Sequence, residues 1–430
     1  MATYTFENMS QSDASAFTAS DFLLFASGTV ANLGVSDTPG TTTSTALGTT
    51  ITNETITLTE NGKSLTFSAA VLSAGTQTSP SHVIFGNNDI AVFGTSAAET
   101  FTVAGAAGHA VAAFGFNGAD SIVGGLGNET INGGEGNDTI VGHSTTSDTD
   151  YLIGGNGADV IQGGNGNDHI YGNVAVGAAG SADGNDVITT GNANNYVNGN
   201  AGDDSITGGT GNDRLYGGNG NDTIVGGGGH DYIQGNKGND VLSDTGSDTI
   251  HGGADNDTIT VTGTGSSQLF GDTGNDTITS GTGNDTIWGG TGYDSLIATA
   301  GGHTKFVFAS GDSDIGNITS ATTAAGHDTV FDTITGFVHG SDTLALGFSV
   351  TAVDTASGTA TTFANADDAY TYAKAILAGH GTDVAALQTI VGGSTDTLLF
   401  WDSTHSTGTI DSVLDLHGYT ASSVVKGDFV

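Results

Sequence analysis

The 430-residue chain contains no cysteine, only 2 prolines and very few basic residues. Without cysteine there is no disulfide framework, no thiolate zinc site and no cysteine nucleophile. Lys and Arg total 6 against 46 Asp and Glu, which gives a formal net charge of −40. Nucleic acid and anionic membranes bind clusters of basic side chains, so neither is expected as a partner.

Long hydrophobic runs are also missing. No apolar stretch approaches about 18 residues, so no membrane span is expected. The first residues, MATYTFENMSQSDASAF, lack the basic and apolar regions of a cleavable signal peptide. Glycine, in contrast, occurs 72 times, and this abundance requires a geometric reason.

A nine-residue repeat supplies that reason. Gly208–Asp240 reads GGTGNDRLYGGNGNDTIVGGGGHDYIQGNKGND, with an aspartate at every ninth position and an Ile or Leu two positions after it. The six residues G-G-x-G-x-D suit a tight turn, because glycine adopts positive φ and lets two backbones approach closely. The remaining x-U-x is a minimal strand whose apolar residue faces inward.

Two such units close a coil of 18 residues, which stacks the aspartates along two edges. Asp204, Asp222 and Asp240 are expected on one edge at about 4.8 Å spacing, and Asp213 and Asp231 on the other. Burying one Ile contributes roughly 2–3 kcal/mol, whereas ordering nine residues costs on the order of 9 kcal/mol or more. Stacked carboxylates repel by a further 1 kcal/mol or so per pair in water. A cation must therefore bridge the turns.

Carboxylates and turn carbonyls are hard oxygen ligands, and their flexible geometry favours Ca²⁺ over Mg²⁺. Because the unfolded chain lacks the site, Ca²⁺ binding and folding are expected to be one event. The repeat resembles the G-G-x-G-x-D-x-U-x unit of the repeats-in-toxin (RTX) family. The resemblance covers roughly residues 115–297, with full motifs ending at Asp138, Asp159, Asp168, Asp213, Asp222 and Asp231.

The predicted fold is therefore all-β: a calcium-stabilised parallel β-roll flanked by a small β-rich N-terminal region and a β-rich C-terminal cap with one helix. On the order of ten Ca²⁺ ions are expected. The predicted carboxylate ligands are Asp120, Asp138, Asp150, Asp159, Asp168, Asp186, Asp204, Asp213, Asp222, Asp231, Asp240, Asp248, Asp257, Asp276, Asp285 and Asp294. The predicted turn carbonyls are those of Gly134, Gly136, Gly155, Gly157, Gly164, Gly166, Gly209, Gly211, Gly218, Gly220, Gly227 and Gly229.

Some turns depart from the pattern. Glu129 and Asn195 occupy aspartate positions, as does Ser267 one residue out of phase, and these turns are expected to bind weakly. Asp248 follows Asp240 after eight residues instead of nine.

Two segments are longer than the repeat allows. Three extra residues precede Asp150. Between Asp168 and Asp186, residues 172–185 contain either a nine-residue insertion or a turn without a carboxylate at Gly177. The choice decides which edge Asp186 joins.

Composition divides the chain into an N-terminal assembly or adhesion region (1–84), the roll (85–299) and a C-terminal cap (300–430). The first region contains a hairpin with Asn61-Gly62 at its turn, and residues 12–26 form either a short helix or a strand. The cap should contain strands, a helix over NADDAYTYAKAILAGHG and a strand pair within 396–420. Its last residues, Asp428, Phe429 and Val430, resemble the signal of RTX proteins exported by type I secretion machinery. The resemblance implies an extracellular or cell-surface location, with folding triggered by Ca²⁺ outside the cell.

No catalytic signature is found, so no enzyme is expected. The zinc-protease motif H-E-x-x-H is absent, and GHSTT around Ser144 lacks the last glycine of a nucleophile elbow. The other residues considered are interpreted as exposed polar positions (His169, His230, His251), cap loop residues (Asp402, His405) and packing residues (Trp288, Trp401).

Open strand edges must be capped or paired, so self-assembly into a surface layer, filament or matrix is expected. The alternative is an adhesin that binds cell-surface polysaccharide, ice or another surface through the Thr- and Asn-lined faces of the roll, and a secreted hydrolase is the least favoured. The threonines of the NDTI segments are expected to face outward, but an ice-like array is disfavoured because other side chains should interrupt their register. The threonines are Thr139, Thr223, Thr258, Thr277 and Thr286, and the interrupting residues are His169, Arg214 and Tyr232.

Overall fold

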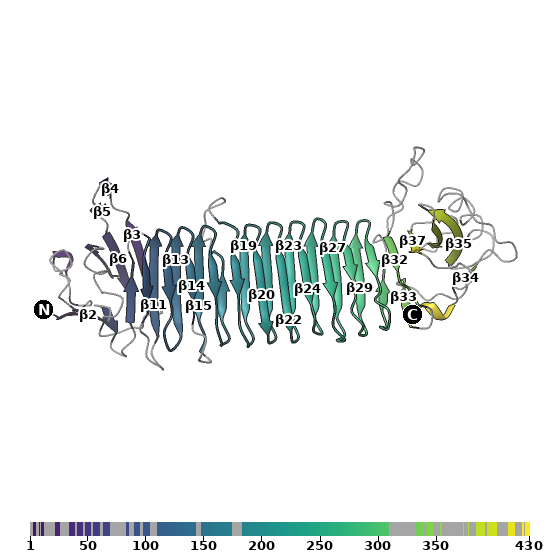
Figure 1. The fold of residues 1–430 in the computed structure, drawn as a ribbon, viewed down its shortest axis with the longest axis horizontal. Helices are drawn as coiled ribbons and strands as arrows, with labels where there is room; N and C mark the ends of the chain where they lie inside the picture. The colour runs from purple at the N-terminus through teal and green to yellow at the C-terminus, as the bar shows by residue number, and fades with distance from the viewer. Residues whose placement is uncertain are drawn as a thin grey trace. The chain divides into compact units, whose positions relative to one another are not determined.

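The computed structural model is nearly all β and confirms the predicted parallel β-roll (Figure 1). It forms two units, residues 1–218 and 219–430, and each is described by itself. The structure describes residues 3–5, 8, 10–12, 22–25, 34–38, 41–45, 48–52, 55–60, 63–68, 83–85, 90–94, 98–103, 110–142, 148–173, 183–308, 332–338, 341–346, 353–354, 373, 377, 384–391, 394–401, 412–417, 424 and 426–430.

The first unit is a coil of two mostly parallel sheets. The odd sheet continues from β1 (Thr3–Thr5), β2 (Phe22–Phe25), β8 (Val83–Phe85) and β9 (Ile90–Phe93) into β11 (Val111–Asn117), β13 (Glu129–Glu135), β15 (Tyr151–Asn156), β17 (His169–Tyr171) and β19 (Tyr196–Ala201). The even sheet contains β10 (Thr100–Thr102), β12 (Ser121–Val123), β14 (Thr139–Val141), β16 (Val160–Gln162), β18 (Val187–Thr189) and β20 (Ser205–Thr210). β21 (Arg214–Asn219) reaches the end of this unit.

Five further strands of the first unit lie outside the coil's ladders. The predicted hairpin is confirmed as β6 (Thr55–Glu60) and β7 (Lys63–Ser68), to which β3 (Gly34–Thr38) adds a third antiparallel strand. β4 (Thr41–Thr45) pairs with β5 (Gly48–Thr52). Within the undecided segment 12–26, residues 22–25 form a strand.

The second unit repeats the two-sheet coil. Its odd sheet contains β23 (Tyr232–Lys237), β25 (Thr249–Ala254), β27 (Gln268–Thr273), β29 (Thr286–Thr291), β31 (Lys305–Val307) and β33 (Thr343–Ala345). Its even sheet contains β22 (Thr223–Gly228), β24 (Val241–Asp244), β26 (Thr258–Val261), β28 (Thr277–Thr279), β30 (Ser295–Ile297) and β32 (Asp332–Thr335).

Beyond β32 the even sheet continues through four strands of the cap. They are β37 (Ser412–His417), β36 (Ser394–Trp401), β35 (Val384–Val391) and β34 (Val353–Asp354). The antiparallel pair β36–β37 confirms the predicted strand pair, whereas β35 was not predicted. Of the predicted helix only Ala373 and Leu377 are described, and both are helical. The chain ends in a 3₁₀ turn, Lys426–Asp428.

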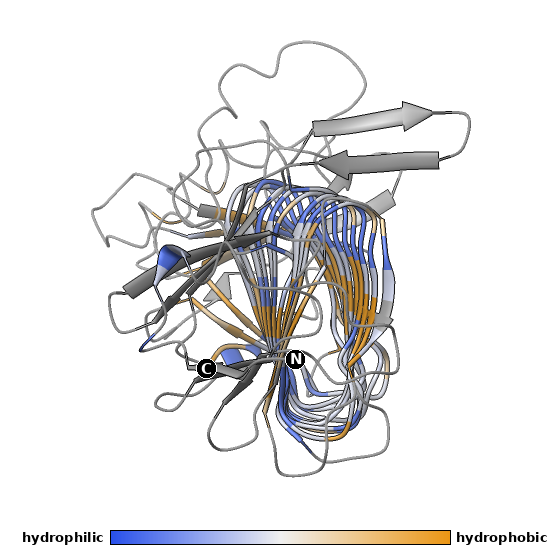
Figure 2. Ribbon diagram, turned by 90° about the vertical axis from the view of Figure 1, so that its left-hand side faces the viewer, coloured by the Kyte–Doolittle hydropathy of each residue, from blue (hydrophilic) through white to orange (hydrophobic). Residues whose placement is uncertain are grey.

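In most strands of the regular repeat, one apolar side chain per strand builds the core. Each lies two positions after an edge residue and is 0% exposed, as in Ile188 and Ile206 of the first unit and Ile250 and Leu269 of the second. Two side chains of this kind per coil leave no room for a broad core, so the turns at the edges must add stability. Figure 2 shows the hydrophobic strands between more hydrophilic turns.

The register confirms the 18-residue coil. Val187 pairs with Ser205, 18 positions on. Val160 pairs with Val187, 27 positions on, so this coil contains nine extra residues and nevertheless keeps its register. The extra residues are therefore an insertion, not a turn without its carboxylate, and Asp186 joins the edge of Asp159.

Candidate calcium sites along the two edges of the coil

A ladder of aspartates runs along one edge of the first unit. The backbone N–H of Asp120 donates to Oδ1 of Asp138 at 2.7 Å, and that of Asp138 donates to Oδ1 of Asp159 at 2.7 Å. Asp159 donates in the same way to Asp186, and Asp186 to Asp204. Each carboxylate therefore joins its turn to the turn before it.

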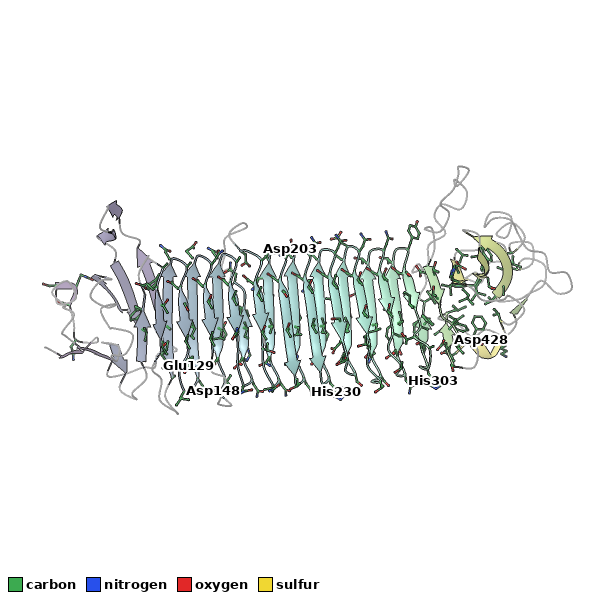
Figure 3. The ribbon with its side chains drawn as sticks, viewed as in Figure 1. Glu129, Asp148, Asp203, His230, His303 and Asp428 are labelled. Carbon is green, nitrogen blue, oxygen red and sulfur yellow. The ribbon has the colours of Figure 1, made fainter. Side chains whose placement is uncertain are left out.

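The opposite edge of the first unit carries the same ladder with two substitutions. Glu129 N–H donates to Oδ1 of Asp150 at 2.8 Å, and Asp150 N–H to Asp168. Asp168 then donates to the side-chain oxygen of Asn195, whose own N–H donates to Asp213. Asn195 thus preserves the hydrogen bond but not the charge. Figure 3 shows Glu129 and Asp148 at this edge and Asp203 at the other.

In the second unit one edge links Asp222, Asp240, Asp257, Asp276 and Asp294 through bonds of the same type. The other edge links Asp231 to Asp248, whose N–H donates to the hydroxyl of Ser267 at 3.1 Å, and Ser267 N–H donates to Asp285. All the predicted aspartates therefore lie at the two edges, and each is at most 3% exposed.

In many of these aspartates the second carboxylate oxygen has no protein donor. It is buried and makes no hydrogen bond in Asp120, Asp138, Asp150, Asp159, Asp168, Asp186, Asp240, Asp248, Asp257, Asp276 and Asp285, and both carboxylate oxygens of Glu129 are in the same position. A buried ionised oxygen without a partner costs several kcal/mol, so rows of them require a bound cation or protonation.

The space beside each free oxygen is shaped by glycine. A Cβ atom added at Gly133 would collide with Oδ2 of Asp138 and with the carbonyl oxygen of Gly154 in the next coil. Gly235 lies in the same way against Asp240 and the carbonyl of Gly252. Glycine therefore leaves open a small cradle that is lined by a carboxylate and a carbonyl oxygen.

Burial raises the pKa of these carboxyl groups. The pKa of Asp120 reaches about 8, mainly through desolvation and also through the charges of Asp138 and Glu99. Desolvation likewise raises the pKa of Asp276 to about 8 and that of Asp257 to about 7. Without a cation, many edge carboxyl groups would thus hold a proton near neutral pH.

The donor set fits Ca²⁺. Buried carboxylate oxygens without hydrogen bonds lie beside backbone carbonyls in a cradle that a single Cβ would fill, and hard oxygen ligands of this kind bind Ca²⁺. The model of the RTX calcium-binding nonapeptide repeat matches residues 114–145, 144–174, 181–215, 207–242, 242–260 and 261–296. The chain carries an RTX calcium-binding β-roll. No curated protein matches this chain.

The carbonyls that line these cradles in the RTX roll together with a free oxygen belong to the first glycine of a turn, such as Gly154 and Gly252. The carbonyls of Gly134 and Gly136, which were predicted as ligands, face Gly155 and Gly157 of the next coil. Gly155 has a φ of 116°, which only glycine adopts readily. The predicted carbonyl ligands stay a prediction.

The ladder of the RTX roll extends beyond the predicted aspartates. Asp294 N–H donates to Oδ1 of Asp332 at 2.9 Å, and Thr304 N–H donates to Oδ1 of Asp342 at 2.8 Å. Both aspartates begin a D-T-U segment, DTIT and DTLA, that matches the strand half of the repeat without its glycine turn. That half-motif is the sequence signal from which both aspartates could have been predicted.

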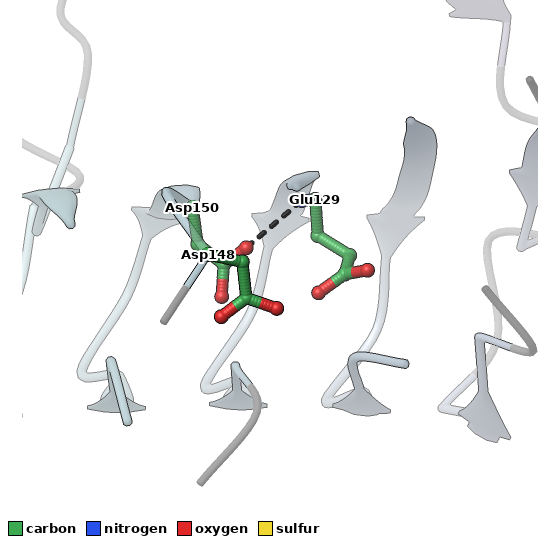
Figure 4. A group of neighbouring side chains, drawn as sticks. All are labelled: Glu129, Asp148 and Asp150. Atoms are coloured by element: carbon green, nitrogen blue, oxygen red, sulfur yellow. Dashed lines mark hydrogen bonds between the residues drawn. The ribbon is translucent and has the colours of Figure 1, made fainter. Parts of the chain in front are cut away.

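Among the described residues, two places bring three carboxylates within 4.8 Å: Glu129 with Asp148 and Asp150, and Asp231 with Asp244 and Asp248. Figure 4 shows the first group and its one hydrogen bond, from Glu129 to Asp150. Glu129, expected to weaken its turn, therefore lies in a group rich in carboxylates. Asp148 and Asp244 were missed because they stand outside the nine-residue phase.

The remaining predicted residues have structural positions. His169 and His230 are exposed, as expected, whereas His251 is half-buried, 2.9 Å from Asp272 and stacked on Phe270. Packing roles are confirmed for Trp288, stacked on Phe270 at 4.3 Å, and for Trp401, which is 2% exposed. Ser144, Asp402 and His405 lie outside the described residues.

The last residues of the chain pack against β33 of the second unit. Asp428 is 1% exposed, and Val430 N–H donates to the carbonyl of Leu344 at 2.9 Å. Phe429 forms a bridge with the same Leu344. No helix among the described residues is long and apolar enough to cross a membrane.

The predicted interruption of the threonine rows is wrong. Strands β14, β22, β26 and β28, which carry Thr139, Thr223, Thr258 and Thr277, belong to the even sheets. His169, Arg214 and Tyr232 lie on β17, β21 and β23 of the odd sheets, as does Thr286 on β29. The supposed interruptions therefore lie on the opposite face.

In the coil strands of the even sheets, from β10 to β32, the residues on either side of the buried core residue form what we call the threonine face, which is composed of Thr, Ser, Val, Gln and Ile. In the first unit they are Thr100, Thr102, Ser121, Val123, Thr139, Val141, Val160, Gln162, Val187, Thr189, Ser205 and Thr207. In the second they are Thr223, Val225, Val241, Ser243, Thr258, Thr260, Thr277, Thr279, Ser295, Ile297, Thr333 and Thr335.

Proposed function

We propose that this calcium-binding repeat protein is a secreted structural protein that folds on Ca²⁺ outside the cell and assembles into a surface layer, filament or matrix. The observation that carries the proposal is the double row of buried carboxylates, among them Asp138 and Asp168 in the first unit and Asp257 and Asp285 in the second, whose second oxygens are buried without a hydrogen bond. Such a coil is strongly disfavoured while its carboxylates are ionised and no cation is bound, so extracellular Ca²⁺ would act as the folding trigger.

The threonine face supports the assembly part of the proposal. Val160 and Val187 are 38% and 47% exposed and lie side by side in the first unit. Val225 and Val241 are 39% and 48% exposed on adjacent strands of the second unit. Because this surface is uncharged and exposes valines, a second copy can cover it without burying any negative charge.

Export through a type I channel is part of the same proposal. It is supported by the resemblance of Asp428, Phe429 and Val430 to the C-terminal signal of exported RTX proteins. RTX proteins of this type are typically secreted, and a chain that stays unfolded at cytosolic Ca²⁺ would suit threading through a channel.

The test is a Ca²⁺ titration of EDTA-stripped protein, with circular dichroism and light scattering followed on one sample. We expect the β signal and the scattering to rise together at millimolar Ca²⁺ and to fall on adding EDTA, with Mg²⁺ as the control cation. Folding without any rise in scattering would contradict assembly. A β signal that needs no Ca²⁺ would contradict the folding trigger.

A matched pair of variants tests the surface. Val241→Lys places a charge on the threonine face, whereas Gln268→Lys places it at an exposed position of the opposite sheet in the same unit. We expect both to fold with Ca²⁺ and only Val241→Lys to stay monomeric. Equal scattering from both would remove the threonine face from the assembly contact.

A second candidate, an adhesin, is favoured by the same uninterrupted threonine face. Its hydroxyl and methyl groups repeat at about 4.8 Å across the strands, and such an array suits an ordered solid or polysaccharide surface. Adsorption of the folded monomer to polysaccharide or ice, lost in Val241→Lys and retained in Gln268→Lys, would support this candidate over assembly.

A further inference from the structure

Asp244 changes the chemistry of one turn in the second unit. In the ordinary repeat a glycine follows the aspartate by four positions, as Gly226 follows Asp222 and Gly235 follows Asp231. Asp244 stands at this position after Asp240, and the turn DTGSD that it begins is one residue shorter than G-G-x-G-x-D. A carboxylate therefore replaces the residue that elsewhere leaves the cradle open.

The side chain of Asp244 points inward. Asp244 is 2% exposed, and Oδ1 accepts hydrogen bonds from the backbone N–H groups of Thr245 at 2.5 Å and Gly246 at 3.3 Å. Oδ2 is buried and accepts none, and it lies where a Cβ atom on Gly226 would be. The turn backbone thus fixes one oxygen and aims the other at the preceding turn.

Two ladder carboxylates lie close to that of Asp244. Asp231 and Asp248 are each 3% exposed, and their carboxylates lie within 4.8 Å of that of Asp244. Asp248 uses Oδ1 to accept from Asp231 N–H at 2.9 Å, while its Oδ2 is buried without a hydrogen bond. Two buried oxygens, Oδ2 of Asp244 and Oδ2 of Asp248, are therefore available to bind a ligand from outside the protein, such as a cation.

The next turn supplies no further charge on this edge. Asp248 N–H donates to the hydroxyl of Ser267 where other turns have a carboxylate. The negative charge of this stretch is thus concentrated in one group of three carboxylates. Ca²⁺ affinity rises with the number of charged ligands, and this group has more carboxylates than an ordinary turn.

We propose that Asp231, Asp244 and Asp248 form a Ca²⁺ site distinct from the ordinary turn sites, and that it is the first to fill in the second unit. Asp244 contributes the additional carboxylate. The proposal rests on the proposed calcium-dependent function and adds to it a defined starting point for folding of the second unit. A shared proton among the three carboxylates is the competing explanation.

The test is Ca²⁺ binding by the full chain, measured by equilibrium dialysis at free Ca²⁺ concentrations fixed with a chelator. Asp244→Gly restores the ordinary residue of the repeat, and Asp244→Asn retains the shape without the charge. The control, Asp203→Asn, restores the usual asparagine of the repeat at an exposed position (Figure 3). Circular dichroism at millimolar Ca²⁺ establishes that each variant folds.

For both Asp244 variants we expect the first binding step to move to about tenfold higher Ca²⁺, or the number of bound ions to fall by one per chain. Asp203→Asn should match the wild type. An unchanged first binding step in both Asp244 variants would overturn the proposed site and would favour a proton shared among the three carboxylates. Calcium-dependent folding would not be affected by that result. Absence of Ca²⁺ binding by the wild type at millimolar concentration would instead overturn the proposed function as well.

Discussion

The two faces of the coil differ sharply although the same repeat builds both. The outward residues of the odd sheets include a row of rings: Tyr171, Tyr196 and Tyr216 follow one another at 5.6 and 5.5 Å in the first unit. In the second unit Phe270 lies between His251 and Trp288, at 4.3 Å from each. The threonine face contains no ring. Core and edges therefore fix the fold, and the two outward faces are free to differ.

Removing calcium should unfold both faces together, because both depend on the same two edges. We expect amide hydrogen exchange in EDTA to rise to the unfolded level in β26 and β27 together, since the carboxylate ladders hold the turns on both sides of each strand. Exchange is measured by mass spectrometry with and without Ca²⁺. If one sheet stayed protected in EDTA, the edges would not be the common support of both.

Acidification should partly restore both faces without metal. Burial raises the pKa of Asp120 to about 8 and that of Asp257 to about 7, well above the unfolded value of 3.8. A raised pKa stabilises the fold below the unfolded value, and this contribution is lost as the pH rises through the folded value. The β signal of metal-free protein should therefore increase on acidification from about pH 9 to about pH 5.

With Ca²⁺ present the pH dependence should reverse, because protons compete with the cation for the same oxygens. The midpoint of the Ca²⁺ titration should lie at higher Ca²⁺ at about pH 5 than at about pH 8. Circular dichroism follows both experiments. A metal-free signal that falls on acidification would contradict the assigned burial of the carboxyl groups.

Removing one ring should weaken the odd sheet measurably. Phe270→Ala breaks two stacked contacts, and we expect a loss of about 1–3 kcal/mol in the free energy of unfolding, since each aromatic pair is worth about 0.5–1.5 kcal/mol. Urea unfolding at saturating Ca²⁺ provides the measurement. Phe270→Leu, which keeps much of the apolar area, should lose less, and an equal loss would assign the effect to area and not to stacking.

The smallest effect is expected on the threonine face. Thr260 occupies a half-buried position on the neighbouring even strand, and Thr260→Ala should change the free energy of unfolding by less than about 0.5 kcal/mol. The same urea experiment compares it with Phe270→Ala. A loss as large as that of the ring variant would mean that the threonine face is part of the fold's stability, and not a surface kept for contacts.

The sequence predicted the coil because its period fixes strand, turn and buried residue at once. Asp186 and Asp204 meet across one edge as their spacing of 18 requires. The prediction placed threonines and interrupting residues on the same face because it treated every nine-residue unit as equivalent. Only a period of 18 separates Tyr232 on one sheet from Thr223 on the other.

The candidate site was predictable to the extent that its residues obey the period. Asp244 and Asp148 lie out of phase and come into the edges only through a shortened and a lengthened turn. Asp332 and Asp342 follow long connections, so no spacing links them to Asp294 and Thr304. Their positions depend on how the chain returns to the sheet, which the local sequence does not specify.

The nine additional residues between β17 and β18 leave the register unchanged, since Val160 still pairs with Val187 and Asp159 with Asp186. The length of the connection between β17 and β18 therefore does not affect the spacing of the carboxylate ladder. A foreign peptide placed within residues 174–182 should be carried at one defined point of the first unit without altering the order of the ligands. The length of this connection could therefore change, in evolution or by design, without rebuilding the scaffold.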